Sequence, residues 1–323
     1  MTGLRRASGL PERVVVRAPG KVNLALQVSP VGDDGYHRVV SVFQAVSLFE
    51  DVTATRGDGL SITASGLQSE LVPLDGSNIA WRAAELLAAE VGVDPDVHLH
   101  LAKGVPVAGG MAGGSADGAA ALLACDALWG TGVPRERLLE LAGELGADVA
   151  FPLVGHTAVG TGRGELLTPA LVRGELHWAF GLRRAGISTA ASYGRFDERL
   201  AEAAARGEDV PIADSWDDEP GTALMAALRA GDAEGVGAHL RNDLESASCD
   251  LEPALREVVD VARAAGALGV VVSGSGPTVA ALGRSPRHAL ALAAAMMAAD
   301  VVDDVVTATG NVPGARLLAL PTP

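Results

Sequence analysis

Residues 104–118 read Gly-Val-Pro-Val-Ala-Gly-Gly-Met-Ala-Gly-Gly-Ser-Ala-Asp-Gly, with six glycines in fifteen positions. The helix-forming stretch Ala119 to Trp129 follows without a break. Small residues let backbone N–H groups converge on an anion, and the N-terminus of the next helix adds partial positive charge. The segment therefore predicts a phosphate-binding loop, with a glycine-rich packing turn as the alternative.

The charge balance makes such local binding necessary. The chain has 25 Lys and Arg against 40 Asp and Glu, a formal net charge of −15. This argues against a nucleic-acid-binding protein or one that binds an anionic membrane, because both need clustered basic residues. The glycine segment also differs from the P-loop, which ends in Gly-Lys-Ser/Thr, and it follows no dinucleotide-binding βαβ unit.

The composition indicates a folded protein without disulfides. Of 323 residues 48 % are hydrophobic, enough for a core, and the length favours two domains with a boundary near residue 170. Cys125 and Cys249 form no CxxC pair. Residues 1–12 lack the apolar core of a secretory signal, and Ser-Gly-Ser-Gly-Pro interrupts the uncharged stretch 264–283. We expect a cytoplasmic protein that does not span a membrane.

The remaining patterns predict an α+β protein, because strands and helices alternate irregularly along the chain. The helix that starts near Asn78 has Ser77 as its expected N-cap. In the first half we expect strands at 14–16, 22–28, 39–48 and 98–101, helices at 78–91, 119–129 and 135–145, and a hairpin at 155–169. In the second half we expect strands at 172–182, 268–272, 278–282 and 301–307, and helices at 189–205, 221–230, 232–247, 251–265 and 286–299.

Five segments resemble motifs of the GHMP kinases and occur in that superfamily's order. They are Ala-Pro-Gly-Lys-Val-Asn-Leu at 18–24, Gly-Asp-Asp-Gly-Tyr-His at 32–37, the glycine segment, Leu-Gly-Ala-Asp-Val at 145–149 and Val-Ser-Gly-Ser-Gly-Pro-Thr at 272–278. Together they resemble the 4-diphosphocytidyl-2-C-methyl-D-erythritol kinases of the non-mevalonate isoprenoid pathway, over residues 14 to 300. The segment at 272–278 is expected to close on the site and shape it.

The resemblance implies a fold and a reaction. It implies an ATP-binding, catalytic N-terminal domain over 1–170 and a smaller α+β C-terminal domain over 171–323. The cofactors would be ATP and Mg²⁺, and the substrate a cytidine diphosphate derivative of methylerythritol. Two alternatives stay open: another small-alcohol kinase of the superfamily, acting on homoserine or mevalonate, and a nucleotide-binding sensor without catalysis.

Two residues carry the chemistry in this interpretation. Phosphoryl transfer needs positioning, charge neutralisation and a base for the attacking hydroxyl. The resemblance implies that Asp148 is the base and that Lys21 pairs with it and offsets the developing charge. From the residues alone, Lys21 could instead be a solvent-facing residue of an edge strand, and Asp148 could bind its own turn.

The nucleotide is expected at the glycine segment. Asn78 and Lys103 match positions near the family's adenosine site, although a helix-start asparagine and a solvated lysine would also explain them. The implied cofactor-binding residues are Asn78, Lys103, Pro106, Val107, Ala108, Gly109, Gly110, Met111, Ala112, Gly113, Gly114, Ser115 and Ala116.

The cytidine is expected at Tyr36 and His37, where an aromatic ring can stack on a base and an imidazole can hydrogen-bond its edge. Tyr193 resembles the second aromatic residue beside the base, with ordinary helix packing as its alternative. Asn23 follows Lys21 by two residues, so both side chains share a strand face, and Asn23 could help to hold the substrate.

The glycine segment departs from the family pattern at two places. Met111-Ala112 stands where the family usually has Leu-Gly, and Ser115-Ala116-Asp117 replaces Ser-Ser-Asn. Ser115 is left as the hydroxyl for phosphate or metal, so the sequence does not identify the metal ligands. Asp117 is expected to cap the helix, with a water-mediated metal contact as the alternative. The oligomeric state is not predicted.

Overall fold

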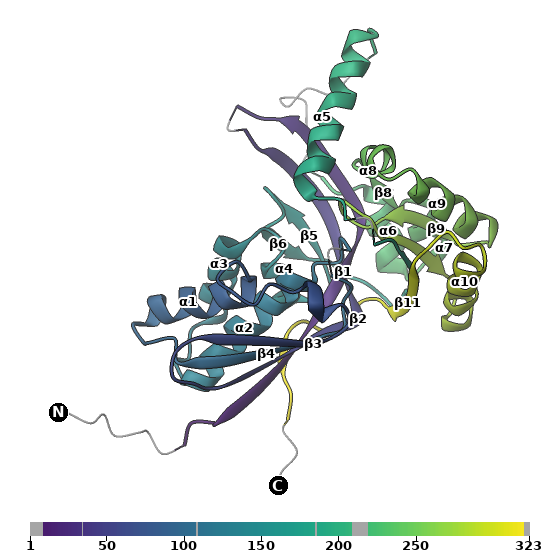
Figure 1. The fold of residues 1–323 in the computed structure, drawn as a ribbon. Helices are drawn as coiled ribbons and strands as arrows, with labels where there is room; N and C mark the ends of the chain where they lie inside the picture. Colours follow the sequence, from purple (N-terminus) through teal and green to yellow (C-terminus); the bar gives the residue numbers. More distant parts are fainter. Residues whose placement is uncertain (1–8, 34, 108, 185, 209–218, 320–323) are drawn as a thin grey trace, which may run out of the picture.

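The computed structural model describes residues 9–33, 35–107, 109–184, 186–208 and 219–319. Ala108 lies outside the described residues, and so does most of the segment 207–220, whose sequence is rich in Asp and Glu. Within these ranges the chain forms an eight-stranded and a four-stranded sheet, each covered by helices (Figure 1). The predicted α+β class is confirmed.

Two long antiparallel strands, β1 (Arg13–Val31) and β2 (His37–Arg56), form the spine of the first sheet. The predicted strands at 14–16, 22–28 and 39–48 are parts of these two. β-Bulges after Pro19 and Asn23 shift the pairing of β1 with β2. The bulges interrupt the alternation of apolar and polar residues, so the sequence pattern predicts separate short strands where β1 is continuous. The other strands of this sheet are β3 (Ser61–Gly66), β4 (Val97–Lys103), β5 (Thr157–Thr161), β6 (Leu166–Pro169), β8 (Arg241–Asn242) and β12 (Arg316–Leu317).

Helices cover one face of this sheet and bury its core. Leu87, Leu99, Leu122 and Leu141 are all fully buried between the strands and the helices. A 3₁₀ turn, η1 (Ser69–Leu71), follows β3. The helices are α1 (Ile79–Val91), α2 (Gly113–Trp129), α3 (Arg135–Leu145) and α4 (Ala150–Val154).

Two predicted helix starts in this part are wrong. The N-cap of α1 is Asn78, whose side chain accepts a hydrogen bond from the Ala80 N–H, while Ser77 bonds to Asp75. Helix α2 begins at Gly113 rather than at Ala119, so the second half of the glycine segment is helical. Close packing favours glycine at two of these positions: an added Cβ would lie 2.9 Å from Glu50 Oε1 at Gly113 and 2.5 Å from the Ile79 side chain at Gly118.

The second sheet has the order β11-β7-β10-β9 and is antiparallel throughout. Trp178 and Phe180 of β7 are fully buried in its core. The strands are β7 (His177–Leu182), β9 (Gly269–Val272), β10 (Val279–Gly283) and β11 (Asp304–Thr309). The helices are α5 (Thr189–Ala205), α6 (Thr222–Ala230), α7 (Ala233–Ala238), α8 (Glu245–Leu251), α9 (Ala254–Ala264) and α10 (Pro286–Ala298).

The predicted helix at 232–247 is wrong, because the chain leaves α7 and forms β8 before α8 begins. The Asn242 amide explains the break, since it donates to the carbonyls of Val272 and Gly274. Helix α5 agrees with its predicted range and projects beyond the rest of the molecule beside the β1–β2 hairpin (Figure 1).

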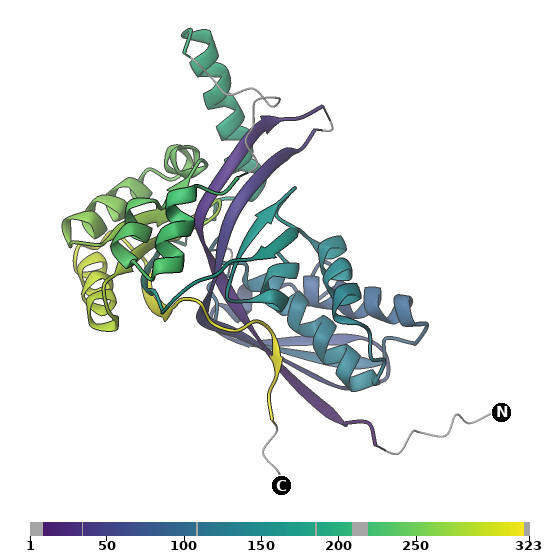
Figure 2. The ribbon, with the colours of Figure 1, turned by 180° about the vertical axis from the view of Figure 1, so that it is seen from behind.

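The two halves of the chain share strand β1. Strand β8 pairs with β1 at Ala25 and Leu26, and β12 pairs with it at Val16 and Arg17. Figure 2 shows the C-terminal segment running from the second sheet back to the first. The boundary near residue 170 therefore stays a prediction. None of the described helices is both long and apolar enough to cross a membrane.

Candidate active site

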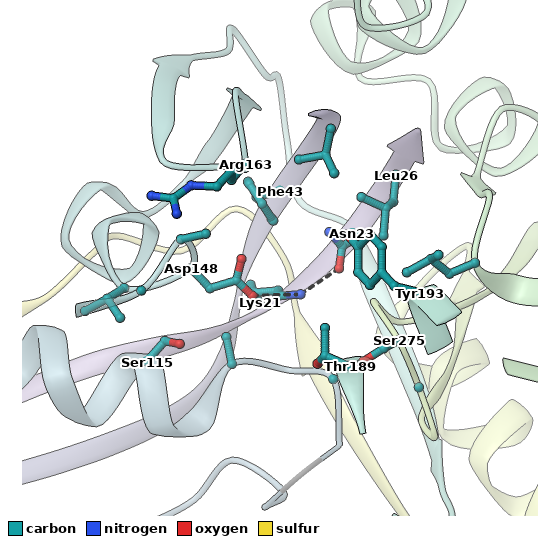
Figure 3. Close-up of a pocket in the computed structure, with 18 of the residues that line it drawn as sticks. Lys21, Asn23, Leu26, Phe43, Ser115, Asp148, Arg163, Thr189, Tyr193 and Ser275 are labelled. Carbon is teal, nitrogen blue, oxygen red and sulfur yellow. Dashed lines mark hydrogen bonds and ion pairs between the residues drawn. The ribbon is translucent and has the colours of Figure 1, made fainter. Parts of the chain in front are cut away.

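A cavity of about 560 Å³ lies where β1, the glycine segment, the turn before α4 and the start of α5 meet (Figure 3). Its walls combine residues from both halves of the chain. Lys21, Asn23, Ser115 and Asp148 come from the first half, and Tyr193 comes from the second. The sequence had placed all five at the candidate site.

Lys21 is fixed at the centre of this cavity. Its side chain is 4 % exposed, and its Nζ donates to Asn23 Oδ1 at 2.7 Å and lies 3.6 Å from Asp148 Oδ2. The Asn23 amide in turn donates to the Ser41 hydroxyl. The Lys21 ammonium also lies 5.6 Å from the centre of the Phe43 ring. Lys21 is therefore a buried, oriented cation and not a solvent-facing strand residue.

Asp148 stands opposite Lys21 and is open to the cavity. It follows Gly146, where α3 ends, and its side chain is 39 % exposed. The carboxylate can therefore reach a substrate hydroxyl while its other side faces the ammonium. Figure 3 shows Lys21 between Asp148 and Asn23, with dashed lines to both.

The glycine segment contacts the second half of the chain at Gly110. The Ser273 hydroxyl donates to the Gly110 carbonyl at 3.1 Å, and a Cβ on Gly110 would lie 2.2 Å from the Ser273 carbonyl oxygen. The φ of Gly110 is +71°, which also favours glycine. Ser275 and Gly276 line the cavity, so the 272–278 segment does lie against the site.

The predicted nucleotide-binding residues divide among three cavities. Gly110, Ala112 and Ser115 line the main cavity, while Met111, Gly113 and Ala116 are buried beside it. Pro106, Val107 and Gly109 line a second cavity of about 550 Å³. Asn78, Lys103, Val107 and Gly114 line a third, of about 240 Å³. The side chain of Asn78 also caps α1, as its alternative interpretation supposed.

Lys103 belongs to a buried ion cluster and is not a solvated lysine. Its Nζ lies 2.7 Å from Glu50 Oε1 and donates to Asp117, and all three side chains are at most 3 % exposed. The expected role of Asp117 as a helix cap is wrong, because no side chain caps α2 and Lys103 holds the Asp117 carboxylate. Asp117 also lines the third cavity, so its alternative role, a water-mediated metal contact, stays a prediction.

The buried cluster has two carboxylates for one ammonium, and the pKa values of all three groups are raised. Burial raises the pKa of Glu50 to about 7, and the charge of Asp117 adds to the rise. Burial raises the pKa of Asp117 to about 6, although Lys103 opposes it. Burial also lowers the pKa of Lys103, but the two carboxylates outweigh that effect and the pKa is raised. The ammonium therefore stays charged.

The structure brings His37 and Tyr193 together, with ring centres 4.9 Å apart. His37 Nδ1 lies 2.8 Å from the Ser29 carbonyl oxygen, which fixes the ring. Burial raises the pKa of Tyr193 to about 12, with the charge of Asp148 adding to it, so the phenol is neutral. Tyr36 is 58 % exposed, and the Arg163 guanidinium lies 5.7 Å from the centre of its ring.

Several residues at the site were not predicted from the sequence. Phe43, Arg163 and Thr189 line the main cavity, and Glu50 holds Lys103. Glu50 had a visible signal, because it alternates with Val52 on β2 and so faces the core. Arg163 lies in the polar turn Gly-Arg-Gly-Glu at 162–165, where nothing in the pattern distinguishes it from a solvated turn residue.

Comparison with known proteins decides the family. Residues 78–156 match the model of the GHMP kinase N-terminal domain, and residues 224–302 match that of the GHMP kinase C-terminal domain. The chain is 52 % identical over 316 residues to the 4-diphosphocytidyl-2-C-methyl-D-erythritol kinase of Thermobifida fusca, covering 95 % of this chain and 99 % of the relative. It belongs to this family of GHMP kinases.

Other relatives of the kinase agree. The enzyme of the same name from Streptomyces coelicolor is 51 % identical, over 94 % of this chain and 99 % of the relative. A crystal structure of 4-(cytidine 5'-diphospho)-2C-methyl-D-erythritol kinase is 30 % identical and superposes with a TM-score of 0.67, covering 92 % of this chain and 99 % of that chain. The homoserine kinase of Cytophaga hutchinsonii shares the fold, with a TM-score of 0.73 at 23 % identity over 98 % and 100 % of the two chains.

Proposed function

We propose that this small-molecule kinase transfers the γ-phosphoryl group of ATP to the 2-hydroxyl of 4-diphosphocytidyl-2-C-methyl-D-erythritol, in the cytoplasm. Relatives with this activity in their names match nearly the full chain at about half identity. The observation that carries the chemistry is the open Asp148 carboxylate beside the buried Lys21 ammonium, 3.6 Å apart in one cavity.

The reaction follows from this pair. The hydroxyl of the bound substrate gives its proton to the Asp148 carboxylate as its oxygen attacks the γ-phosphorus, and the bond from the γ-phosphorus to the β,γ-bridging oxygen breaks to release ADP. The Lys21 ammonium, held by Asn23, offsets the negative charge that grows on the attacking oxygen. The neutral Tyr193 phenol can donate a hydrogen bond in the same cavity, and His37 beside it would bind the edge of the cytosine.

ATP would bind along the glycine segment, with its phosphates toward Ser115 at the start of α2. The backbone N–H groups of the first helical turn and the helix dipole attract phosphate without a basic patch. Asn78 and Lys103, with the third cavity beside them, would lie near the adenosine.

The residues present are compatible with Mg²⁺ held mainly by phosphate. The described residues contain no group of three or more His, Cys, Asp or Glu side chains that could hold a metal ion. Mg²⁺ commonly keeps several waters and binds one or two protein oxygens together with substrate phosphates. Ser115 lines the cavity and would supply one such oxygen. When bound, the ion would neutralise phosphate charge during transfer.

A substrate comparison tests the proposal. The purified full chain is given ATP and one of three alcohols: the cytidylyl substrate, homoserine or mevalonate. We expect ADP release with the cytidylyl substrate and none above background with the other two. Turnover of mevalonate or homoserine, with none of the cytidylyl compound, would contradict the proposal and leave the placing of His37 and Tyr193 unexplained.

A further inference from the structure

Arg163 occupies a position at the main cavity that the reaction as described does not use. It lies in the turn between β5 and β6 and lines the cavity together with Lys21 and Asp148. Among the described residues of the cavity wall, these three carry formal charge. In the view of Figure 3, Arg163 is on the Asp148 side, with its guanidinium pointing away from Lys21.

The two cations of the cavity differ in how firmly they are held. Lys21 is buried and bound to Asn23 and Asp148, so its charge is already compensated. The Arg163 side chain is 56 % exposed, and its Nε lies 3.8 Å from Glu165 Oε1, beyond hydrogen-bond distance. The Arg163 guanidinium can therefore turn toward a ligand at small cost.

The neighbours of Arg163 indicate which part of a ligand it would meet. On one side its guanidinium lies 5.7 Å from the ring of Tyr36, the residue before His37, at which the base is expected. On the other side it shares the cavity wall with Asp148, where the reacting hydroxyl is expected. In the proposed substrate a diphosphate joins the cytidine to the methylerythritol, so that diphosphate must pass between these two places.

We propose that Arg163 binds the diphosphate of the acceptor substrate, an inference that rests on the proposed function. A guanidinium suits this ligand because its planar N–H groups form paired hydrogen bonds with phosphate oxygens. The protein's charge of −15 repels a diphosphate at a distance, so a local cation is needed to hold it. The glycine segment cannot hold this diphosphate as well, since its backbone N–H groups would bind the phosphates of ATP.

The test distinguishes binding of the diphosphate by Arg163 from binding of the base. Arg163→Ala, Arg163→Lys and, as matched control, Glu165→Gln are compared with the unaltered kinase by steady-state kinetics. Inhibition by cytidine 5′-diphosphate and by cytidine is measured in parallel. Glu165 accompanies Arg163 in the turn but does not line the main cavity.

In Arg163→Ala we expect the KM for the cytidylyl substrate and the inhibition constant of cytidine diphosphate to rise about tenfold, the loss of one charge-assisted contact. The KM for ATP and the inhibition constant of cytidine stay unchanged. Arg163→Lys recovers part of the loss, and Glu165→Gln shows none.

Equal losses for cytidine and cytidine diphosphate would overturn the inference, because Arg163 would then act on the base through Tyr36. No loss for either would also overturn it. Both results leave the proposed function intact, since the unaltered kinase still turns over the cytidylyl substrate. Failure of the unaltered kinase to phosphorylate that substrate would refute the function itself, and this inference with it.

Discussion

The molecule contains two lysine–aspartate clusters on the same sheet, and they differ in what surrounds them. At Lys21 a buried ammonium faces a carboxylate, Asp148, that is 39 % exposed. At Lys103 both carboxylates, Glu50 and Asp117, are as buried as the lysine. An open carboxylate can accept a proton from a substrate, whereas the charges of the closed cluster at Lys103 compensate one another inside the protein. The following substitutions test this distinction, beginning with the largest effect.

Asp148→Asn is expected to remove the proton acceptor and to lower turnover by about 10³-fold or more. The amide keeps the shape of the side chain, so ATP binding should persist. The measurement is ADP release beside ATP titration of the same preparation. Equal turnover in the variant and the unaltered kinase would remove Asp148 from the mechanism.

Lys103→Met is expected to cost about 3 to 5 kcal/mol of stability, because it leaves two carboxylates buried without their counter-charge. Urea unfolding at pH 7.5 measures the loss. If the variant were as stable as the unaltered protein, the closed cluster would not stabilise the fold.

Lys21→Met is expected to lower turnover by about 10²-fold, because a positioned cation no longer stabilises the transition state. Its unfolding free energy should fall by less than that of Lys103→Met, since the exposed Asp148 can remain hydrated. The two variants are therefore compared in both assays. A larger stability loss at Lys21 than at Lys103 would reverse the assignment of the two clusters.

Asp117→Asn is expected to have the smallest effect, one that depends on pH. A carboxyl whose pKa is raised in the folded state binds a proton more tightly there than in the unfolded chain. Its contribution to stability is thus present at low pH and is lost as pH rises from its usual pKa, about 4, through about 6. The variant should escape this loss.

Urea unfolding of Asp117→Asn and the unaltered protein between pH 4 and 8 checks this. The variant should gain about 2 to 3 kcal/mol relative to the unaltered protein across that interval, since the shift is about two pKa units. Parallel stability curves would show that the Asp117 carboxyl does not titrate within it.

The sequence predicted the elements whose patterns are local. Helices α3 and α5 agree with their predicted ranges, and the motifs placed Lys21, Asn23 and Asp148 at one site. The predictions that failed concern segments whose conformation depends on tertiary packing. Gly113 belongs to α2 although glycine has a low helix propensity. Asn242 lies in a predicted helix, but in the structure its side chain binds the carbonyls of Val272 and Gly274 and no helix forms there.

The cluster around Lys103 shows a second limit of the sequence. Asp117 is one turn into α2, and its position alone suggested a cap or a contact with metal. Its partner Lys103 ends β4, and Glu50 lies on β2, far away in the chain. Only the packing of α2 across these strands brings the three charges together, so no local pattern could identify the cluster.

Both halves of the chain pair with β1, and this limits which chimaeras of related kinases can fold. One edge of this strand receives β12 at Val16 and Arg17 and β8 at Ala25 and Leu26, and both partners come from beyond residue 170. A chimaera that takes its second half from a relative must therefore match two strand edges as well as the cavity. Its success is decided along β1, which carries Lys21, and not at the junction where the genes are joined.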